Sequence, residues 1–370
     1  MQSLTAQKAD TAMFDLNNIM RLAPFSLSKR EKTALYVDAL YKLTKHHYVN
    51  CPQYRRIIDT LMFDLAAKHA IEDMLFMPAR LFKDHELLSV EKSQIIKTIT
   101  SSGTGGQNVS RIFLDRITAA NQRKVLIKIV SDFIGAKRLP MLIIDAKPTL
   151  KDPSSISARG AGISVFSMFG YDLTYALDRD LQLDFDAVEA FYNKHKDENI
   201  ILFGFTYMIW EYFYKKLVKS NSQFAFENAI LIHGGGWKRL NEEAVDNDTF
   251  KGLLKKVCGI KRIHNYYGMV EQAGSIFMEC EFGYLHSSIF SDVIIRRADF
   301  SVCNMRETGL MQIMSLLPLS YPGHIILSED AGEVIGEDDC SCGRLGKYFK
   351  VHGRIKNAEI RGCSDAYTSK

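Results

Sequence analysis

The sequence lacks any apolar run of the ~18 to 20 residues that a membrane-spanning helix requires. The apolar stretch within residues 137–145 is far too short and is better interpreted as a buried strand. The first 15 residues mix Lys8, Asp10 and Asp15 with small side chains, and they lack the continuous apolar segment of a secretory signal. We therefore expect a cytoplasmic protein with no membrane span.

The chain also lacks a strong charge of either sign. Its 47 basic and 43 acidic residues leave a net charge of +4, spread along 370 residues. This balance gives no electrostatic reason to expect binding to nucleic acid or to an anionic membrane surface. With 46% hydrophobic residues and no internal repeat, the chain is long enough for one large core or two adjoining ones.

A paired set of cysteines is absent as well. The seven cysteines are odd in number and scattered, which argues against a disulfide framework in a chain of this size. Reactive or metal-binding roles are the alternatives. The cysteines are Cys51, Cys258, Cys280, Cys303, Cys340, Cys342 and Cys363.

The pattern of apolar residues predicts an α/β protein with helices at its start. From about residue 26 to 70, apolar side chains recur three and four positions apart, as on one helix face. Short apolar runs then alternate with amphipathic stretches, which predicts buried strands joined by helices. The predicted strands are 139–144, 163–169, 200–205 and 229–233, and the predicted helices are 118–133, 184–195 and 207–218.

Past about Glu271 the pattern changes to that of a β-rich lobe. Strands are predicted at 284–295, 309–316 and 324–328, joined by turns around Pro318, Pro322 with Gly323, and Ala331 with Gly332. We therefore expect four regions. These are an N-terminal helical layer (1–95), an α/β core (96–270), the β-rich lobe (271–352) and a tail (353–370).

Two glycine-rich segments are suited to binding a ligand. Residues 98–107 combine Ser and Thr hydroxyls with three glycines, so backbone N–H groups and hydroxyls can converge on phosphate; a flexible surface turn explains the same composition. Residues 230–238 place three successive glycines directly after a predicted strand, where α/β proteins bind ligands or where a tight turn needs them.

Two acidic residues follow distinctive turns. Glu271 comes just after Tyr267 and Gly268 and is suited to magnesium held against phosphates, although a single glutamate is normally solvated surface. Asp330 lies in a predicted turn after a strand, where it can accept hydrogen bonds from a ribose or stabilise the turn.

Taken in order, these segments resemble the adenylate-forming superfamily of acyl-CoA synthetases, adenylation domains and luciferase-type enzymes. Within it, the chain is most similar to the LuxE family of acyl-protein synthetases, which serve bacterial fatty-acid reductase systems. The likeness covers about residue 75 to the end. It is carried by Phe76-Met-Pro with Phe82-Lys83, Thr100-Ser-Ser-Gly-Thr, Gly234-Gly-Gly-Trp-Lys238, Ser320-Tyr-Pro and Arg361-Gly-Cys-Ser364.

The resemblance implies the α/β fold of the superfamily's large N-terminal domain, with layered sheets, a smaller β-rich lobe and a truncated mobile C-terminal domain. It also implies ATP and Mg²⁺ as cofactors, residues 96–270 as the nucleotide-binding core, Glu271 as the magnesium ligand and Arg354 near a hinge. The implied nucleotide-binding residues are Ser101, Ser102, Gly103, Thr104, Gly105 and Gly106 at the phosphates, Gly234, Gly235 and Gly236 at the adenine, Tyr267, Gly268, and Asp330 at the ribose.

By the same resemblance, Cys363 is the nucleophile that carries the acyl group. Adenylation gives the carboxylate a good leaving group, and a thiolate can then capture the acyl group as a thioester. The alternative is an inert thiol in a loose tail; the neighbouring Arg361 favours the thiolate.

The sequence departs from the superfamily pattern at three points, which keeps other functions open. No lysine follows the phosphate loop, Ser328-Glu329-Asp330 replaces the common Thr-Gly-Asp, and Asn357 replaces the hinge aspartate. The alternatives are a CoA-dependent acyltransferase that loads an acyl carrier protein through Cys363, and a non-catalytic partner subunit. The substrate is a fatty or aryl carboxylic acid or an acyl-CoA, and the acceptor a reductase subunit or an acyl carrier protein.

Four residues of the predicted β lobe form a candidate zinc site. Cysteine and histidine are ligands suited to tetrahedral structural zinc, but their spacing is unlike standard zinc fingers and chance placement explains them too. Segments around them also resemble phenylacetate-CoA-ligase-like relatives, some of which bind zinc there. The four residues are Cys280, His286, Cys340 and Cys342.

Overall fold

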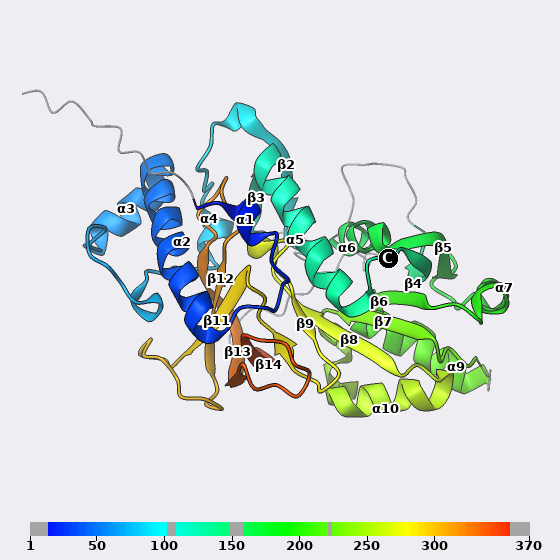
Figure 1. Ribbon diagram of the computed structural model, residues 1–370. Coiled ribbons are helices and arrows are strands. Elements are labelled where there is room, and N and C mark those ends of the chain that lie inside the picture. The colour runs from blue at the N-terminus through cyan, green and yellow to red at the C-terminus, as the bar shows by residue number, and fades with distance from the viewer. Residues whose placement is uncertain (1–13, 102–108, 148–157, 221–223, 356–370) are drawn as a thin grey trace, which may run out of the picture.

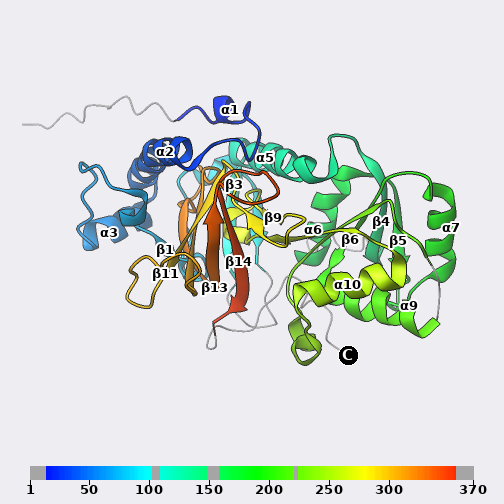
Figure 2. The same ribbon diagram turned by 60° about the horizontal axis from the view of Figure 1, so that its bottom comes forward.

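A mixed β-sheet of 12 strands runs through the molecule (Figure 1, and Figure 2 in a second view). The computed structural model describes residues 14–101, 109–147, 158–220 and 224–355. Eleven strands follow one another in the order β11-β12-β13-β14-β10-β9-β8-β7-β6-β4-β5, and β1 pairs with β13. The predicted boundary at 270 therefore falls inside a continuous sheet, between the neighbouring strands β8 and β9.

One half of the sheet is parallel and apolar. Its strands are β4 (Leu139–Ala146), β5 (Gly170–Leu177), β6 (Ile200–Phe205), β7 (Ala229–Gly234) and β8 (Arg262–Tyr267). Every residue of β6 and β7 is buried, as expected for strands covered on both faces. In Figure 1, α6 and α10 lie on opposite sides of these strands.

Helices connect the parallel strands, as the alternating sequence pattern predicts. They are α6 (Ala158–Phe166), followed by a 3-10 turn at Ser167–Phe169, α7 (Phe185–His195), α8 (Thr206–Met208), a π-helical segment at Ile209–Tyr214, α9 (Lys215–Ser220), a 3-10 segment at Lys238–Glu243, and α10 (Asn247–Cys258).

The prediction of a strand at 163–169 was wrong, because these residues form the end of α6 and the 3-10 turn. Ile163 and Phe166 are three positions apart and both buried, which fits a helix face as well as a strand. A short apolar run does not distinguish the two structures by its periodicity. The true strand, β5, begins at the next residue, Gly170.

The other half of the sheet is antiparallel, apart from the parallel pairing of β1 with β13. Its strands are β1 (Met77–Pro78), β9 (Phe277–Glu279), β10 (Leu285–His286), β11 (Ser291–Arg296), β12 (Gly309–Ser315), β13 (Ile325–Glu337) and β14 (Lys347–Arg354).

Two predictions in this half need correction. The predicted strand 284–295 is two strands, β10 and β11, separated by residues 287–290. The predicted turn at Ala331 and Gly332 is instead the middle of β13, where the pairing with β14 shifts register. A Cβ atom at Gly332 would lie 2.6 Å from the carbonyl oxygen of Lys350, so glycine serves a close strand approach.

The N-terminal region is helical, as predicted, up to Thr60. The Glu31 carboxylate accepts a hydrogen bond of 2.9 Å from the backbone N–H of Ser28, just before the longest of these helices. The elements are α1 (Leu16–Ile19), α2 (Lys29–Asn50), α3 (Pro52–Thr60), a 3-10 turn at Ile71–Asp73, α4 (Leu81–Asp84) and a 3-10 turn at Lys92–Gln94.

A separate two-stranded hairpin of β2 (Ile95–Thr100) and β3 (Arg111–Asp115) leads into α5 (Arg116–Ile134). The predicted helices 118–133 and 184–195 correspond to α5 and α7. Among the helices of the described ranges, we find none that is both long and apolar enough to cross a membrane.

Candidate active site

The predicted phosphate loop connects β2 and β3. At its base, the N–H of Ser101 donates to the carbonyl of Ser110 at 3.0 Å, and the N–H of Ser110 donates to the Ser101 hydroxyl at 2.9 Å. The two serines thus close the base of the hairpin. The other five residues predicted at the phosphates, Ser102, Gly103, Thr104, Gly105 and Gly106, lie outside the described residues.

The three glycines of the predicted adenine turn differ in what they do. Gly234 ends β7, where an added Cβ atom would lie 2.5 Å from the ring of Tyr266, so only glycine fits. Gly235 has a φ of 77°, the left-handed region that glycine adopts without strain. Gly236 is exposed and has no atom within 4 Å of an added Cβ. Packing thus explains the glycine at 234 and backbone conformation explains the one at 235, while Gly236 has space beside it for a ligand.

A hydrogen bond joins two of the sequence motifs. The hydroxyl of Tyr267, at the end of β8, donates to the Asp330 carboxylate on β13 at 2.6 Å. Burial and the neighbouring Asp330 carboxylate hold the pKa of Tyr267 well above its usual value, so the phenol stays a donor. The contact fixes Asp330 relative to the end of β8.

Glu271 lies in the 3-10 turn Val270–Gln272, which packs against β3. Its side chain is buried, and burial raises the pKa of the carboxyl; the Ser110 hydroxyl and the Lys83 ammonium act in the opposite direction. The turn also packs closely against the chain at Gly323, where an added Cβ atom would lie 2.8 Å from the Glu271 carbonyl oxygen. Glu271 is therefore a buried acid next to the base of the phosphate loop.

Two basic residues converge on Glu329, the neighbour of Asp330. Lys83 on α4 places its ammonium 3.4 Å from the Glu329 carboxylate, and Arg354 at the end of β14 lies 3.5 Å from the other oxygen. The Lys83 side chain is 13% exposed, so its charge is largely shielded from water. The structure thus brings Arg354 beside Asp330, its partner in the β13–β14 ladder.

Lys83 had no assigned role in the sequence prediction. Lys83 reaches this position because β1, which begins six residues earlier at Met77, pairs with the first residues of β13, the strand that holds Asp330. Pairing between residues about 250 positions apart is not visible in local periodicity. Cys363, the predicted nucleophile, lies outside the described residues.

The four predicted zinc ligands come together at one end of the antiparallel half. Their ligand atoms all lie within 4.8 Å of one another. The sulfur atoms of Cys280 and Cys340 are 4.0 Å apart, and the Cys342 sulfur is 3.3 Å from Nε2 of His286. Three of the four residues are buried. Three thiols and one imidazole at this spacing match a tetrahedral Cys₃His donor set.

Sequence comparison connects the whole chain to one family. The family model described as "Acyl-protein synthetase, LuxE" matches residues 2–370. A long-chain-fatty-acid–luciferin-component ligase of Vibrio harveyi is 23% identical over 379 residues, which cover 98% of this chain and 95% of the relative. The ligase of the same name from Aliivibrio fischeri is 26% identical over 358 residues, which cover 92% and 88%.

Structural comparison identifies the fold. An open conformation of 2-hydroxyisobutyryl-CoA ligase, in complex with 2-HIB-AMP and CoA, superposes with a TM-score of 0.65 at 13% identity and covers 90% of this chain and 77% of its own. The same ligase in the thioesterification state gives a TM-score of 0.66 at 13% identity, with 95% and 74% covered. The mixed sheet is thus similar to that of adenylate-forming ligases over most of the chain.

Proposed function

Because this chain belongs to the LuxE family of acyl-protein synthetases and is an enzyme, we propose that it activates a fatty acid with ATP and captures the acyl group on Cys363. The carboxylate oxygen attacks the α-phosphorus of ATP, pyrophosphate leaves, and an acyl-AMP forms. The Cys363 thiolate then attacks the acyl carbon, the bond from that carbon to the AMP oxygen breaks, and a thioester remains.

The hydrogen bond between Tyr267 and Asp330 is the observation that carries this proposal. The two residues are 63 positions apart and belong to separate motifs, yet they meet at 2.6 Å. A carboxylate that is oriented by a hydrogen bond from a buried phenol is suited to accept further hydrogen bonds from a ribose. In this proposal Asp330 orients the nucleotide.

The charges around Asp330 support adenylation. Negative charge develops on the phosphates as pyrophosphate departs, and cations fixed nearby stabilise it. Lys83 and Arg354 both lie within 3.5 Å of Glu329, next to Asp330. We assign Lys83 the role of the cation that the phosphate loop lacks, with Glu329 holding it in place.

Magnesium fits the Glu271 position. Glu271 is a buried carboxylate near the base of the phosphate loop, and hard oxygen ligands of this kind bind Mg²⁺ together with substrate phosphates. When bound there, the ion would neutralise charge on the phosphates. Within the described residues, burial of the Glu271 carboxylate is opposed by the Ser110 hydroxyl, by a backbone N–H at Glu271 and by the Lys83 ammonium.

The acyl group is then passed to a partner, either a reductase subunit or an acyl carrier protein. The CoA-dependent acyltransferase is the second candidate, favoured by the missing lysine after the phosphate loop and by Asn357 at the hinge position. Both candidates use Cys363, and they differ in whether the activated acyl group comes from ATP chemistry or from acyl-CoA.

Intact-protein mass spectrometry separates these functions. The protein is incubated with Mg²⁺, ATP and a series of fatty and aryl acids, and in parallel with acyl-CoA without ATP. The controls are Cys363→Ser and Cys303→Ser, which removes another thiol that is not fully buried. The proposal expects an ATP-dependent acyl increment that only Cys363→Ser abolishes. Labelling from acyl-CoA alone would establish the transferase, and no Cys363-dependent increment would favour a non-catalytic subunit.

We also propose that Cys280, His286, Cys340 and Cys342 hold one structural zinc ion, which stabilises the antiparallel half rather than taking part in catalysis. Elemental analysis of purified protein should give one zinc per chain, and Cys340→Ser should lower both the zinc content and the melting temperature. A metal-free protein with an unchanged melting temperature in Cys340→Ser would refute a zinc site.

A further inference from the structure

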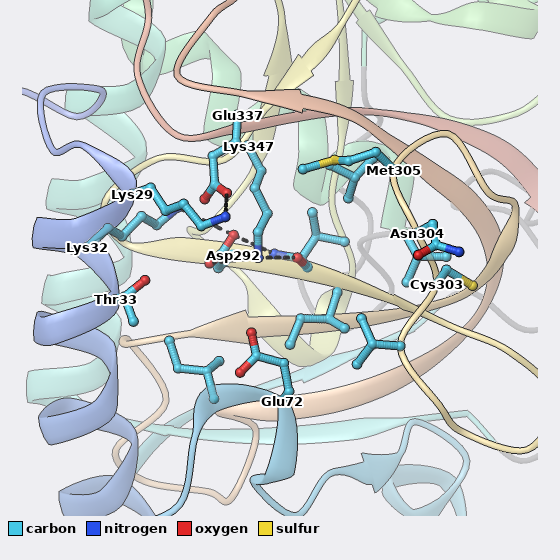
Figure 3. A pocket seen from close by; sticks show the side chains of 16 residues that line it. Lys29, Lys32, Thr33, Glu72, Asp292, Cys303, Asn304, Met305, Glu337 and Lys347 are labelled. Atoms are coloured by element: carbon cyan, nitrogen blue, oxygen red, sulfur yellow. Dashed lines mark hydrogen bonds and ion pairs between the residues drawn. The ribbon is translucent and has the colours of Figure 1, made fainter.

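A cavity of about 200 Å³ lies between α2 and the antiparallel half of the sheet (Figure 3). Its lining includes three lysines, Lys29, Lys32 and Lys347, together with apolar side chains such as Ile71, Ile295 and Val302. A cavity of this size holds several water molecules or a small organic molecule. None of the residues assigned to the candidate active site or to the zinc site lines it.

Lys32 is the unusual member of this cavity. Its side chain is 3% exposed, and its ammonium nitrogen has no hydrogen-bond acceptor within the described part of the chain. Its ion-pair contact with Asp292 is long, at 3.5 Å. A buried ammonium without acceptors is costly, because three N–H donors have lost water and gained little in return.

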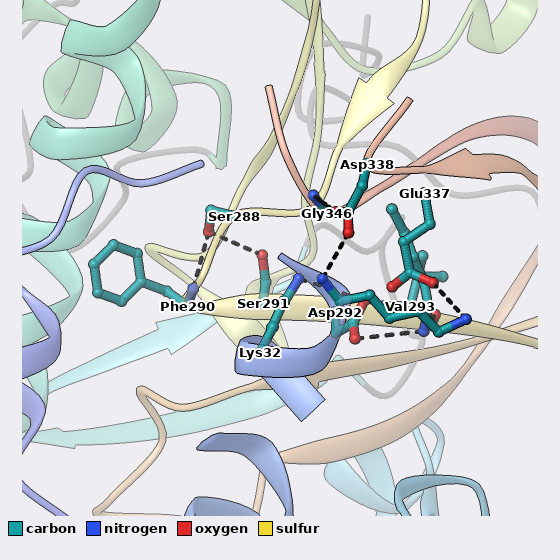
Figure 4. A network of polar contacts seen from close by, with 11 residues as sticks. Lys32, Ser288, Phe290, Ser291, Asp292, Val293, Glu337, Asp338 and Gly346 are labelled. Carbon is teal, nitrogen blue, oxygen red and sulfur yellow. Dashed lines mark hydrogen bonds and ion pairs between the residues drawn. The ribbon is translucent and has the colours of Figure 1, made fainter. Parts of the chain in front are cut away.

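The Asp292 carboxylate is shared between two ammonium groups (Figure 4). Lys347 lies 3.4 Å from its second oxygen, so one buried carboxylate faces both Lys32, labelled in Figure 4, and Lys347, labelled in Figure 3. Burial lowers the pKa of Lys32 and the Lys347 charge acts in the same direction, while Asp292 opposes them. The long contact with Asp292 does not satisfy the three N–H donors of Lys32, so a second acceptor can bind beside this ammonium group.

The remaining charged groups do not supply that acceptor. Glu337 pairs with Lys29 at 3.1 Å at the edge of the cavity, and the exposed Glu72 lies on the opposite edge, as Figure 3 shows. Among the groups that are largely shielded from water, Lys32 and Lys347 face Asp292 and Glu337, whereas the Lys29 side chain is 67% exposed. An exposed carboxylate such as Glu72 is screened by solvent and compensates a buried charge only weakly.

We propose that this cavity binds a small organic oxyanion, a carboxylate or phosphate with a short apolar end. The oxyanion accepts hydrogen bonds from Lys32 and lies against Lys29 and Lys347, and the apolar end lies against Ile71, Ile295 and Val302. The site is separate from the candidate active site, since Val334, the cavity-lining residue of β13 nearest to Asp330, is four residues along the strand, or roughly 13 Å.

Isothermal titration of the full chain with sodium butyrate and with inorganic phosphate, at constant ionic strength kept with sodium chloride, tests the proposal. We expect saturable 1:1 binding of at least one anion with a Kd of about 1 mM or below. Preference for butyrate assigns a carboxylate ligand, and preference for phosphate assigns a phosphate monoester. Lys32→Met should weaken binding about tenfold or more, whereas Lys42→Met, on the same helix but paired with Asp38, should not change it.

A second variant tests the same site in case Lys32→Met does not fold. Val302 is 40% exposed, so Val302→Asp adds a negative charge at the rim with little effect on the fold, and it should weaken anion binding about two- to fivefold. Absence of binding to wild-type protein, or equal binding in wild type, Lys32→Met and Val302→Asp, would overturn the proposal. Because neither anion requires ATP or Cys363, the outcome does not depend on the proposed function.

Discussion

The two halves of the sheet bury different chemistry. The parallel half is filled with apolar side chains, with β6 and β7 buried along their full length. The antiparallel half is less completely buried along β13 and β14, yet its interior holds many polar and charged groups. Among them are Glu279, His286, Ser291, Asp292, Arg296, Gln312, Ser315 and His324.

This difference suggests separate roles: the parallel half mainly stabilises the fold, and the antiparallel half holds most of the candidate ligand-binding residues. Apolar burial stabilises most of the parallel half, where the ion pair of Asp145 with Arg159 at 3.2 Å is a buried charged contact. Buried polar groups cost free energy unless their partners are in place, so paired groups of the antiparallel half, such as Asp292 with Lys347, constrain one another's positions. The candidate zinc ligands, Asp330, Arg354 and the anion cavity all belong to this half. The account therefore expects the two halves to respond differently to substitution.

The largest effect is expected in the parallel half. Phe203 on β6 is 1% exposed and its ring stacks on Phe166 at 4.4 Å. Phe203→Ala should lower the free energy of unfolding by about 3 to 5 kcal/mol, measured by urea denaturation, because it leaves a cavity in a tightly packed core. Leu173→Ala on the neighbouring sheet edge, where the side chain is 41% exposed, should cost less than about 1 kcal/mol.

In the antiparallel half, the effect should depend on which partner is removed. Asp292→Asn leaves Lys32 and Lys347 buried without a carboxylate and should cost about 3 kcal/mol in the same assay. Lys32→Met should change stability by less than about 1 kcal/mol, because Asp292 keeps Lys347 and methionine fills the space. Equal losses in both variants would contradict this asymmetry.

Lys83 tests whether the antiparallel half acts in catalysis. If Lys83 supplies the cation at the phosphates, Lys83→Met should reduce kcat for ATP-dependent acylation by about 10- to 100-fold, or about 1.4 to 2.7 kcal/mol of transition-state stabilisation. The fold should be unaffected, because Glu329 keeps its contact with Arg354. Lys92→Met, which removes an exposed lysine paired with Glu86, serves as the control. A change in KM alone would indicate substrate binding instead.

The most gradual effect is a dependence of stability on pH, which is at most about 1.4 kcal/mol for each pH unit. His324 is buried against the stacked ring of His47, and burial lowers its pKa to about 3, with His46 adding to the effect. A histidine with an unfolded pKa of about 6.5 therefore stabilises the fold fully above pH 6.5 and progressively less as the pH falls toward 3.

Replacing that histidine should flatten the acid side of the stability curve. Between about pH 6 and 4, the free energy of unfolding of His324→Asn should fall less steeply than that of wild type, by up to about 1.4 kcal/mol per pH unit. Urea denaturation at several pH values measures both slopes. His85→Asn, at an exposed histidine, should leave the slope as it is. Parallel curves for wild type and His324→Asn would show that this histidine does not stay neutral in the fold.

Much of the parallel half could be predicted because its signals are local. The predicted strand 200–205 coincides with β6, and α5 and α7 follow their amphipathic patterns. The strand at 163–169 failed because a short apolar run fits both a helix and a strand. In the antiparallel half, Gly332 has the composition of a turn but serves a close approach to β14.

The candidate site was predictable where a motif carries its own chemistry. The cysteine and histidine residue types indicated a metal site, and Cys280 and Cys342 do lie close to the other two candidate ligands. Asp330 was singled out by its motif, and it lies beside Tyr267 of a second motif. The proposed role of Lys83 and the proposed anion site depend on contacts between distant segments, such as β1 with β13 and Lys32 on α2 with Asp292 on β11. Local periodicity contains no information about such pairing.

Exchange of radiolabelled pyrophosphate into ATP tests the central claim most directly, because it reports formation of acyl-AMP without requiring the later transfer. With Mg²⁺ and a fatty acid, the account predicts fatty-acid-dependent exchange in wild type, full exchange in Cys363→Ser, and strongly reduced exchange in Asp330→Asn, folded as judged by circular dichroism. No exchange in wild type with any carboxylic acid, or undiminished exchange in Asp330→Asn, would contradict it.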